Sequence, residues 1–274
     1  MVFLRSLFFN LAFYVLTVVL LVLPLPVYFI LPQAFGMWVV TTWSRAGLFL
    51  LRIVAGTRLE VRGRENLPSG GFIVASKHQS MFETFALSLQ FRNPTYVMKR
   101  QIKWIPIFGQ YTIKTGMIHV DRAAGGAALR LLVARAREEL AKHRPIVIFP
   151  EGTRRPPGAP PVYQSGIAHL YRAVGVPVVP TALNSGLYWP RRKFLRYPGT
   201  IVIEFLPPIA PGLTPREFLA TLIDRIERES DRLLLEADRS SSRPPFPAEA
   251  TARIAVLKRA ATEAASTPPA ASAG

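Results

Sequence analysis

The chain has 274 residues, with 34 Lys and Arg against 17 Asp and Glu, a net charge of +17, and a hydrophobic share of 50%. This share excludes a chain that is disordered throughout, and the absence of Cys excludes disulfide frameworks, thiolate metal sites and acyl-cysteine intermediates. The length allows one or two domains, and the basic balance indicates an anionic partner: nucleic acid, an acidic membrane surface or a phosphorylated ligand.

The N-terminal segment is apolar over a length that suits a membrane. Ser6 to Ser44 form an uncharged run of 39 residues rich in Leu, Val and Phe. As a single helix this run would extend about 58 Å, against a hydrocarbon core of about 30 Å. Pro24 and Pro26 near its middle favour a break. We expect a membrane helical hairpin over residues 1–54, or a span followed by an interfacial helix; a hairpin buried in a core is the alternative.

A cluster of arginines follows the apolar run, and such clusters are typical of the cytoplasmic side of a membrane. Its members are Arg45, Arg52, Arg58, Arg62 and Arg64. The apolar run is too long for a secretory signal and has no clear small-residue cleavage site. The sequence therefore predicts a cell (inner) membrane protein whose main domain lies on the cytoplasmic side.

Residues 55–238 alternate short β-branched runs with helix-period segments, the pattern of an α/β domain. The expected strands are Thr57–Arg62, Phe72–Ser76, Thr95–Lys99, Gly116–Val120, Ile146–Phe149, Val176–Thr181 and Thr200–Phe205. The expected helices are Ser80–Phe91, Ala124–His143, Val162–Val174 and Pro215–Asp238. We predict a mostly parallel or mixed central sheet flanked by helices.

The last of these helices carries a start signal, because Thr214 and Glu217 are spaced as a capping box and Pro215 suits the first helical position. Residues 239–274 are rich in Ala, Pro and Ser. This composition predicts a low-complexity, mostly disordered tail with a short helix across Ala248–Ala264.

Polar residues gather at the ends of two expected strands, in the segments KHQSMFE from Lys77 and PEGTRR from Pro150. The usual nucleotide-binding and HExxH zinc motifs are absent from the sequence. In open α/β sheets ligands bind beyond the carboxyl ends of the strands, so both clusters are placed for one cleft. In the first, Glu83 on the opening helical turn could orient His78 as a base. The alternative is that Ser80 and Glu83 form a capping box.

The second cluster has the chemistry of a phosphate site. Gly152 lets backbone N–H groups approach a ligand, and the guanidinium groups of Arg154 and Arg155 match phosphate oxygens. A charged turn in which Glu151 pairs with a neighbouring Arg is equally compatible with the sequence.

Taken together, the two clusters resemble the glycerolipid acyltransferase family of lysophosphatidate acyltransferases (1-acyl-sn-glycerol-3-phosphate O-acyltransferases, PlsC-like). The resemblance covers roughly residues 59–209 in four ordered blocks. His78 with Glu83 matches His-x4-Asp, and the other blocks are GMIHVDR (Gly116 to Arg122), FPEGTR (Phe149 to Arg154) and VPVVP (Val176 to Pro180).

The resemblance implies roles for single residues. It makes His78 the general base and Glu83 its orienter. It assigns the glycerol phosphate group to Glu151, Gly152, Thr153 and Arg154, helped by Arg122 and Lys99. Pro180 resembles the fourth-block proline on the acyl-donor side, where it supports packing.

The activity implied is transfer of a fatty acyl group from acyl-CoA or acyl carrier protein to the free sn-2 hydroxyl of lysophosphatidate, without cofactor or metal. The implied partners are membrane lipid and the acyl donor, with no nucleic acid; the sequence does not specify the oligomeric state. Other readings are acylation of lyso-ornithine lipid or lysophosphatidylglycerol, and a non-enzymatic membrane-attached anion-binding protein. Two departures from the family pattern bear on the site: Glu83 is one methylene longer than the aspartate, and Lys77 replaces a frequent asparagine.

Overall fold

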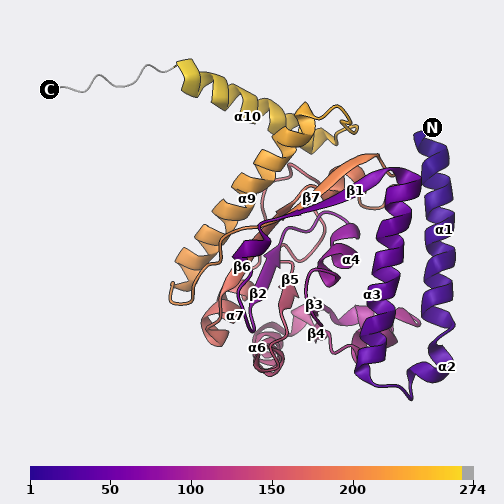
Figure 1. The fold of residues 1–274 in the computed structure, drawn as a ribbon. Helices are drawn as coiled ribbons and strands as arrows, with labels where there is room; N and C mark the ends of the chain where they lie inside the picture. The colour runs from indigo at the N-terminus through magenta and orange to yellow at the C-terminus, as the bar shows by residue number, and fades with distance from the viewer. Residues whose placement is uncertain (267–274) are drawn as a thin grey trace.

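Seven strands form one sheet at the centre of the computed structural model, which describes residues 1–266 (Figure 1). The strands are β1 (Thr57–Arg62), β2 (Ile73–Ser76), β3 (Thr95–Lys99), β4 (Ile118–Val120), β5 (Ile146–Ile148), β6 (Val178–Leu183) and β7 (Gly199–Phe205). Their order is β1-β7-β6-β2-β5-β3-β4, and all neighbours pair in parallel except β6 and β7. The predicted mixed, mostly parallel sheet is confirmed.

Helices cover both faces of the sheet. Those of the α/β domain are α4 (Phe82–Ser88), α5 (Phe108–Lys114), α6 (Gly125–Ala141), α7 (Gly166–Val174), α8 (Ser185–Tyr188) and α9 (Pro215–Arg239). Short 3-10 turns lie at η2 (Arg64–Asn66), η3 (Arg100–Trp104) and η4 (Arg122–Ala124). Each predicted strand is present to within two residues at either end, whereas α5 and α8 were not predicted.

Strand residues alternate between two cores, as the two-residue period of a sheet requires. Val74 and Val147 belong to a core that includes residues of α4. Ile73 and Ile146 belong to the other core, which residues of α6, α7 and α9 complete. Because both faces are covered, β2, β5 and β6 are buried along their whole length and are mostly apolar instead of alternating with polar residues.

Helix α9 begins with the predicted capping box. The Thr214 hydroxyl accepts a hydrogen bond from the Glu217 N–H at 3.3 Å, and the Glu217 carboxylate accepts one from the Thr214 N–H at 2.9 Å. Together these bonds satisfy two backbone donors, the Glu217 N–H in the first turn and that of the capping residue itself.

An N-terminal helical hairpin packs against one side of the domain (Figure 1). It consists of α1 (Val2–Val22), the short α2 (Leu25–Tyr28), α3 (Gln33–Leu50) and the π-helical continuation η1 (Leu51–Ala55). The predicted break is confirmed, since α1 ends before the prolines and Pro24 caps α2. Val2–Val22 and Gln33–Ala55 are both long and apolar enough to cross a membrane.

The two faces of α1 differ in environment. Phe13 on the inner face packs against Trp43 of α3 in a tilted arrangement and against Trp189 edge-to-face, with ring centroids 5.9 and 5.7 Å apart. The outer face exposes large apolar side chains: Phe3, Leu4, Leu7, Phe8, Leu11, Tyr14, Val15, Val18 and Val19. An exposed apolar strip of this length favours a membrane-facing hairpin over one buried in a core.

The helix expected across Ala248–Ala264 in the C-terminal tail is confirmed, and it extends two residues further. α10 spans Ala248–Ser266, and residues 267–274 of the tail lie outside the described residues. Its first turns dock on α9: Ala250 and Ile254 are buried, and Arg253 binds Asp231 through both carboxylate oxygens, with Nε at 2.9 Å. Alanine-rich composition makes the helix, and this docking fixes its position.

Candidate active site

The two polar clusters are neighbours in space because they follow adjacent parallel strands. β2 pairs with β5 in a register that sets Ala75 opposite Ile148. Both main-chain polar groups of His78 bind the second cluster. The His78 N–H donates to Glu151 Oε2 at 3.1 Å, and the His78 C=O accepts from the Arg155 N–H at 2.8 Å. The two polar clusters that the sequence assigned to one cleft are therefore adjacent at this edge of the sheet.

His78 and Glu83 form a hydrogen-bonded pair. His78 Nδ1 lies 2.7 Å from Glu83 Oε1, so the extra methylene of Glu83 is accommodated. The same oxygen accepts from the N–H groups of Gln79 and Ser80, each at 2.7 Å, and Glu83 Oε2 accepts from the Ser185 hydroxyl at 2.7 Å. Three donors besides the imidazole, the two N–H groups and the Ser185 hydroxyl, therefore hold this buried carboxyl group in place.

The carboxylate has the two roles that the sequence presented as alternatives. It binds the Ser80 N–H, as Glu in a capping box does, and it also binds the imidazole. The Ser80 hydroxyl accepts from the Phe82 N–H at 3.2 Å and not from the Glu83 N–H, so the box itself is incomplete. The capping contact therefore fixes the carboxylate that faces His78.

The imidazole is held flat against Phe149, the first residue of FPEGTR. The two rings are stacked, with centroids 4.0 Å apart and planes 17° apart. Glu83 Oε1 already accepts two N–H groups, which suits the tautomer in which Nδ1–H donates to it and Nε2 carries the free lone pair. Nε2 has no hydrogen-bond partner among the side chains that the structure describes, and the His78 side chain is 13% exposed. The nitrogen that can accept a proton therefore remains available.

Arg154 lies in a cationic environment beside the pair. Residues 149–152 form a tight turn in which the Gly152 N–H donates to the Phe149 carbonyl at 2.9 Å, and Gly152 has a φ of 71° that favours glycine. Partial burial lowers the pKa of Arg154, and Arg191 and Arg192 act in the same direction, whereas the Glu83 carboxylate opposes the shift. A desolvated guanidinium among like charges has the properties of an anion site.

Glu151 departs from its expected role at the phosphate. Its side chain is 0% exposed and is directed inward, with Oε1 3.1 Å from the Lys77 ammonium and Oε2 on the His78 N–H. Burial raises the pKa of Glu151, and the Lys77 cation opposes that shift. A buried carboxylate in this position cannot contact an acceptor phosphate, so its assignment as a phosphate ligand is corrected.

The remaining predicted residues occupy varied positions. Lys99 ends β3 and is exposed, two strands from β2 at the same edge of the sheet. Thr153 lies half-buried in the turn. Pro180 is buried within β6 opposite Ala75, and the next residue's carbonyl accepts from the Lys77 N–H at 2.9 Å. The Arg122 side chain lies outside what the structure describes.

Comparison with known proteins supports the resemblance found in the sequence. A family profile described as Acyltransferase matches residues 58–184. The 1-acyl-sn-glycerol-3-phosphate acyltransferase of Pseudomonas aeruginosa is 41% identical over 191 residues, which cover 69% of this chain and 74% of the relative. The chain belongs to the 1-acyl-sn-glycerol-3-phosphate acyltransferase family. Membership makes it an acyltransferase of phospholipid biosynthesis and removes the non-enzymatic alternative.

Two further similarities extend this result. The human 1-acyl-sn-glycerol-3-phosphate acyltransferase alpha is 30% identical over 186 residues, which cover 66% of this chain and 65% of the relative. The crystal structure of the 1-acyl-sn-glycerophosphate acyltransferase PlsC from Thermotoga maritima has a TM-score of 0.70 at 22% identity, covering 85% of this chain and 98% of that chain. At that identity the structural match shows the fold.

In this acyltransferase, helix α8 completes the site, and sequence patterns did not reveal it. Ser185 is 102 residues from Glu83 along the chain but binds its carboxylate. The adjacent Gly186 N–H donates to Gln79 Oε1 at 3.0 Å. A helix of four residues is too short for a periodic signal, so α8 could be found only from the folded chain.

Gly186 offers a test of how closely α8 must approach the loop after β2. A Cβ at this position would lie 2.8 Å from Pro157 Cδ and 2.9 Å from Gln79 Cβ. We expect Gly186→Ala to lower the free energy of unfolding by about 1–3 kcal/mol. We also expect it to reduce activity, because the added methyl group would displace Gln79, the residue next to His78. Thermal unfolding and acyl-transfer assays of the purified chain would measure both effects.

Gly166→Ala is the matched control, since Gly166 also opens a helix but has no atom within 4 Å of its added Cβ. That variant should unfold no earlier than the wild-type acyltransferase and should retain full activity. Equal behaviour of the two variants would contradict the close approach of α8.

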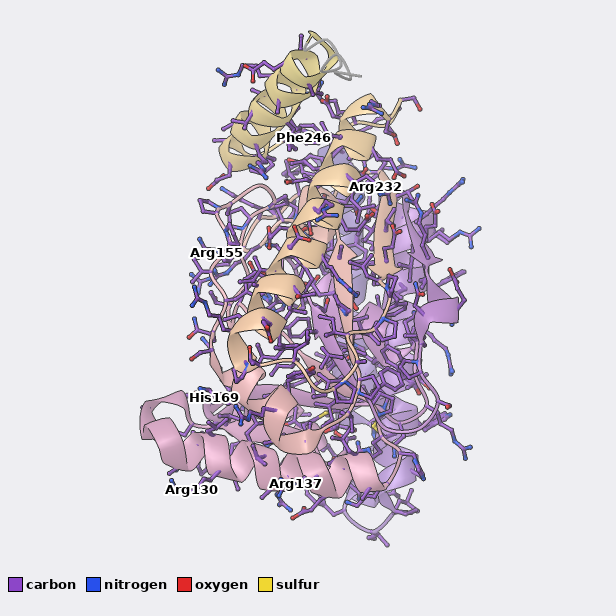
Figure 2. The ribbon with its side chains drawn as sticks, turned by 90° about the vertical axis from the view of Figure 1, so that its left-hand side faces the viewer. Arg130, Arg137, Arg155, His169, Arg232 and Phe246 are labelled. Atoms are coloured by element: carbon purple, nitrogen blue, oxygen red, sulfur yellow. The ribbon has the colours of Figure 1, made fainter. Side chains whose placement is uncertain are left out.

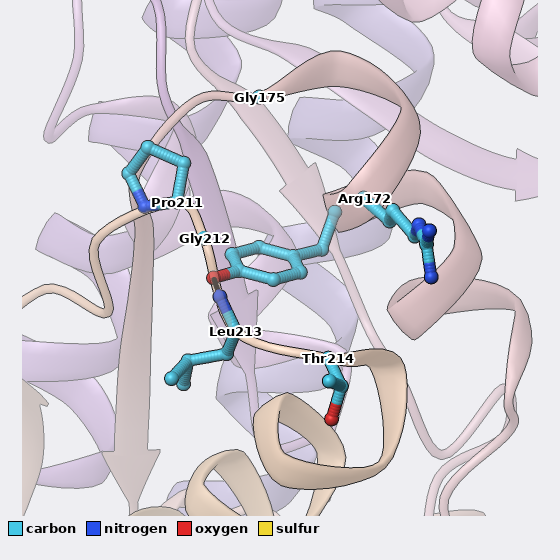
Figure 3. A pocket seen from close by; sticks show the side chains of 7 residues that line it. Arg172, Gly175, Pro211, Gly212, Leu213 and Thr214 are labelled. Atoms are coloured by element: carbon cyan, nitrogen blue, oxygen red, sulfur yellow. Dashed lines mark hydrogen bonds between the residues drawn. The ribbon is translucent and has the colours of Figure 1, made fainter.

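A second hollow of the acyltransferase lies far from this site. It is a pocket of about 260 Å³ between α7 and residues 211–214 (Figure 3). Tyr171 lines the pocket, and its hydroxyl donates to the Ala210 carbonyl at 2.6 Å and accepts from the Leu213 N–H at 3.0 Å. It sits at the edge of the sheet where β6 begins, opposite the edge where β2 and β5 end. Figure 2 likewise places His169 of α7 near α6, well separated from Arg155.

Proposed function

We propose that this acyltransferase moves a fatty acyl group from acyl-CoA or acyl carrier protein to the sn-2 hydroxyl of lysophosphatidate, giving phosphatidate. The observation that carries the proposal is the His78–Glu83 pair at 2.7 Å, attached to the turn that bears Arg154. The names of the relatives from Pseudomonas aeruginosa and human support the same acceptor.

The reaction requires a base and no enzyme-bound acyl group. His78 Nε2 takes the proton of the acceptor hydroxyl while the hydroxyl oxygen forms a bond to the thioester carbonyl carbon. The Glu83 carboxylate, which accepts from Nδ1–H, stabilises the imidazolium that results. The carbon–sulfur bond then breaks, and the leaving thiolate takes the proton from Nε2. The products are the new ester and the free thiol of the donor.

Arg154 supports the choice of a phosphorylated acceptor. Its guanidinium lies near enough to interact electrostatically with Glu83, and a planar fork binds phosphate oxygens bidentately. Binding the phosphate at a fixed distance from His78 would place the sn-2 hydroxyl at the base, which converts binding energy into correct orientation. Exposed Lys99, at the same edge of the sheet, would add positive charge around the entering anion.

Arg154→Ala tests this role. We expect kcat/KM for lysophosphatidate to fall about tenfold to a hundredfold, because charge-assisted bonds to the phosphate are lost. Turnover of a monoacylglycerol, which has no phosphate, should change little. Arg172→Ala serves as the control, since Arg172 is exposed on α7 and lines the distant pocket. Equal losses with both acceptors would rule out a phosphate contact by Arg154.

The hairpin supports a reaction at a membrane surface, and the arginine cluster that follows it supports the cytoplasmic face of the inner membrane. The Ser6 hydroxyl accepts from the Arg196 N–H at 2.9 Å, and the Asn10 side chain donates to the Phe194 carbonyl at 3.0 Å. These contacts bring the start of α1 to the loop between α8 and β7, beside the edge of the sheet that bears His78. Arg191, Arg192 and Lys193 are exposed in that loop, where they suit an anionic lipid surface.

The full chain in lipid vesicles provides the direct test. Oleoyl-CoA and oleoyl-acyl carrier protein are supplied separately with lysophosphatidate, and thiol release and phosphatidate are measured. We then expect lysophosphatidate to outcompete lysophosphatidylglycerol and lyso-ornithine lipid. Preferential acylation of either competitor would overturn the proposed acceptor while leaving the acyl transfer itself intact.

A further inference from the structure

Lys77 is a buried cation directly before the proposed base. Its side chain is 4% exposed, and its ammonium lies 2.5 Å from Glu227 Oε1 on α9 and 3.1 Å from Glu151 Oε1. A buried charge is tolerated only where partners of opposite charge replace its hydration. Here two carboxylates from distant parts of the chain provide that replacement.

Glu151 connects this cation to the proposed base. One carboxylate oxygen faces Lys77, and the other accepts the His78 N–H at 3.1 Å. Burial raises the pKa of Glu151, and the Lys77 charge opposes that shift. A cation at this point therefore favours the ionised carboxylate, which makes the stronger hydrogen bond to the His78 main chain.

The Lys77 side chain is anchored on the side of α9. Together with Gln79 and Glu227 it lines a cavity of about 490 Å³ that α9, α10 and residues 157–161 enclose. The Tyr163 hydroxyl donates to Glu227 Oε1 at 2.7 Å, and the Lys77 ammonium lies 5.7 Å from the centre of the Tyr163 ring. These contacts occupy the ammonium with protein partners, so it is not available to an acceptor phosphate.

We propose that Lys77 is a positioning residue for acyl transfer. It holds the Glu151 carboxylate in the orientation that binds the His78 main chain, and Glu227 in turn holds the Lys77 ammonium in place. The inference rests on the proposed role of His78. Loss of the hydrogen bond from the His78 N–H to Glu151 would leave the His78 main chain bound only through its C=O, so the imidazole could shift relative to Arg154. A shift of about 1 Å can cost on the order of a hundredfold in rate.

Lys77→Met tests the proposal by replacing the ammonium with an apolar side chain of similar length. We expect kcat to fall at least about tenfold, with KM for lysophosphatidate changing less than about threefold, because Arg154 is untouched. Lys142→Met removes the same charge from an exposed position after α6, where Lys142 pairs with Glu139 at 2.9 Å. This control should match the wild type in kcat and KM.

The double variant Lys77→Met/Glu151→Gln separates positioning from other roles. The amide oxygen introduced at position 151 can still accept a hydrogen bond from the His78 N–H. Because the amide is neutral, it does not need the Lys77 cation as a partner. We expect kcat to recover about tenfold over Lys77→Met. If Lys77 merely stabilised the fold, the second substitution would raise the thermal unfolding midpoint and leave the kcat of the folded enzyme unchanged. A raised KM with unchanged kcat would instead place the Lys77 charge on the acceptor. Either result overturns the inference.

Glu227→Gln keeps the test decisive if Lys77→Met does not fold. The amide oxygen can still accept from Tyr163 and Lys77, but the negative charge that anchors Lys77 is gone, so kcat should fall about threefold to tenfold with KM unchanged. A wild-type chain that acylates a different lyso-lipid overturns the proposed acceptor, and the variants are then compared on that lipid. A wild-type chain active on lysophosphatidate with a fully active Glu227→Gln or Lys77→Met overturns the positioning role alone.

Discussion

His78→Ala should reduce kcat by about 10²- to 10⁴-fold, the usual contribution of a positioned general base. The imidazole is held by Glu83 on one side and by the Phe149 ring on the other, so its free Nε2 has a fixed direction. Without it, the acceptor hydroxyl must lose its proton to water while attacking the thioester. Thiol release from oleoyl-CoA in the presence of lysophosphatidate measures the loss.

His169→Ala provides the comparison for this experiment. His169 is exposed on α7 and lies close to α6, away from the EGTRR turn (Figure 2). Its removal should leave kcat within about twofold of the wild type, since surface substitutions away from the site have small effects. His78→Gln, which fills more of the space against Phe149, should be as inactive as His78→Ala. Substantial turnover by either His78 variant would mean that another group takes the proton.

Glu83→Gln should lower kcat about 10²-fold or more, while the protein remains folded. Gln can keep an oxygen toward His78 Nδ1 and the N–H groups of Gln79 and Ser80, and its amide can donate to the Ser185 hydroxyl. The negative charge is lost, so the imidazolium formed during attack is no longer stabilised. Comparison of kcat with the thermal unfolding midpoint separates this electrostatic effect from a loss of structure.

Glu83→Asp retains the charge and restores the residue of the family motif, with a side chain one methylene shorter. It should therefore keep at least about tenfold more activity than Glu83→Gln. Glu138→Gln, at an exposed site on α6 that pairs with Arg135, is the charge-matched control and should be unaffected. If Glu83→Gln were as active as Glu83→Asp, the carboxylate would be only a helix cap.

Much of the α/β domain follows from local patterns. The strands Thr57–Arg62 and Thr95–Lys99 have the predicted bounds, because short β-branched runs flanked by turn residues report directly on strand formation. The start of α9 is equally local, since Thr214 and Glu217 satisfy each other's backbone groups within one turn. The break in the N-terminal hairpin follows from Pro24 and Pro26, which remove backbone donors from a helix.

The C-terminal helix was predicted from local composition, whereas its docking on α9 was not. Ala-rich sequence is compatible with both helix and disorder, and most helical stability in proteins comes from tertiary packing. Burial of Ala250 and Ile254 against the domain, together with the Arg253–Asp231 pair, favours the helix. That energy comes from residues of α9 that are distant in the chain.

The sequence by itself determined the alternating strands and helices and the apolar hairpin, because each depends on residues within a few positions of one another. It also placed Glu83 within reach of His78, but it left open whether the carboxylate orients the imidazole or caps the helix. Tertiary structure alone decided which side chains surround that pair. Ser185 reaches Glu83 from 102 residues away, and Lys77 and Glu227 are 150 residues apart yet in contact. It also directed Glu151 inward, because Lys77 is buried beside the base. Leaving that cation unpaired would cost more free energy than burying the Glu151 carboxylate next to it.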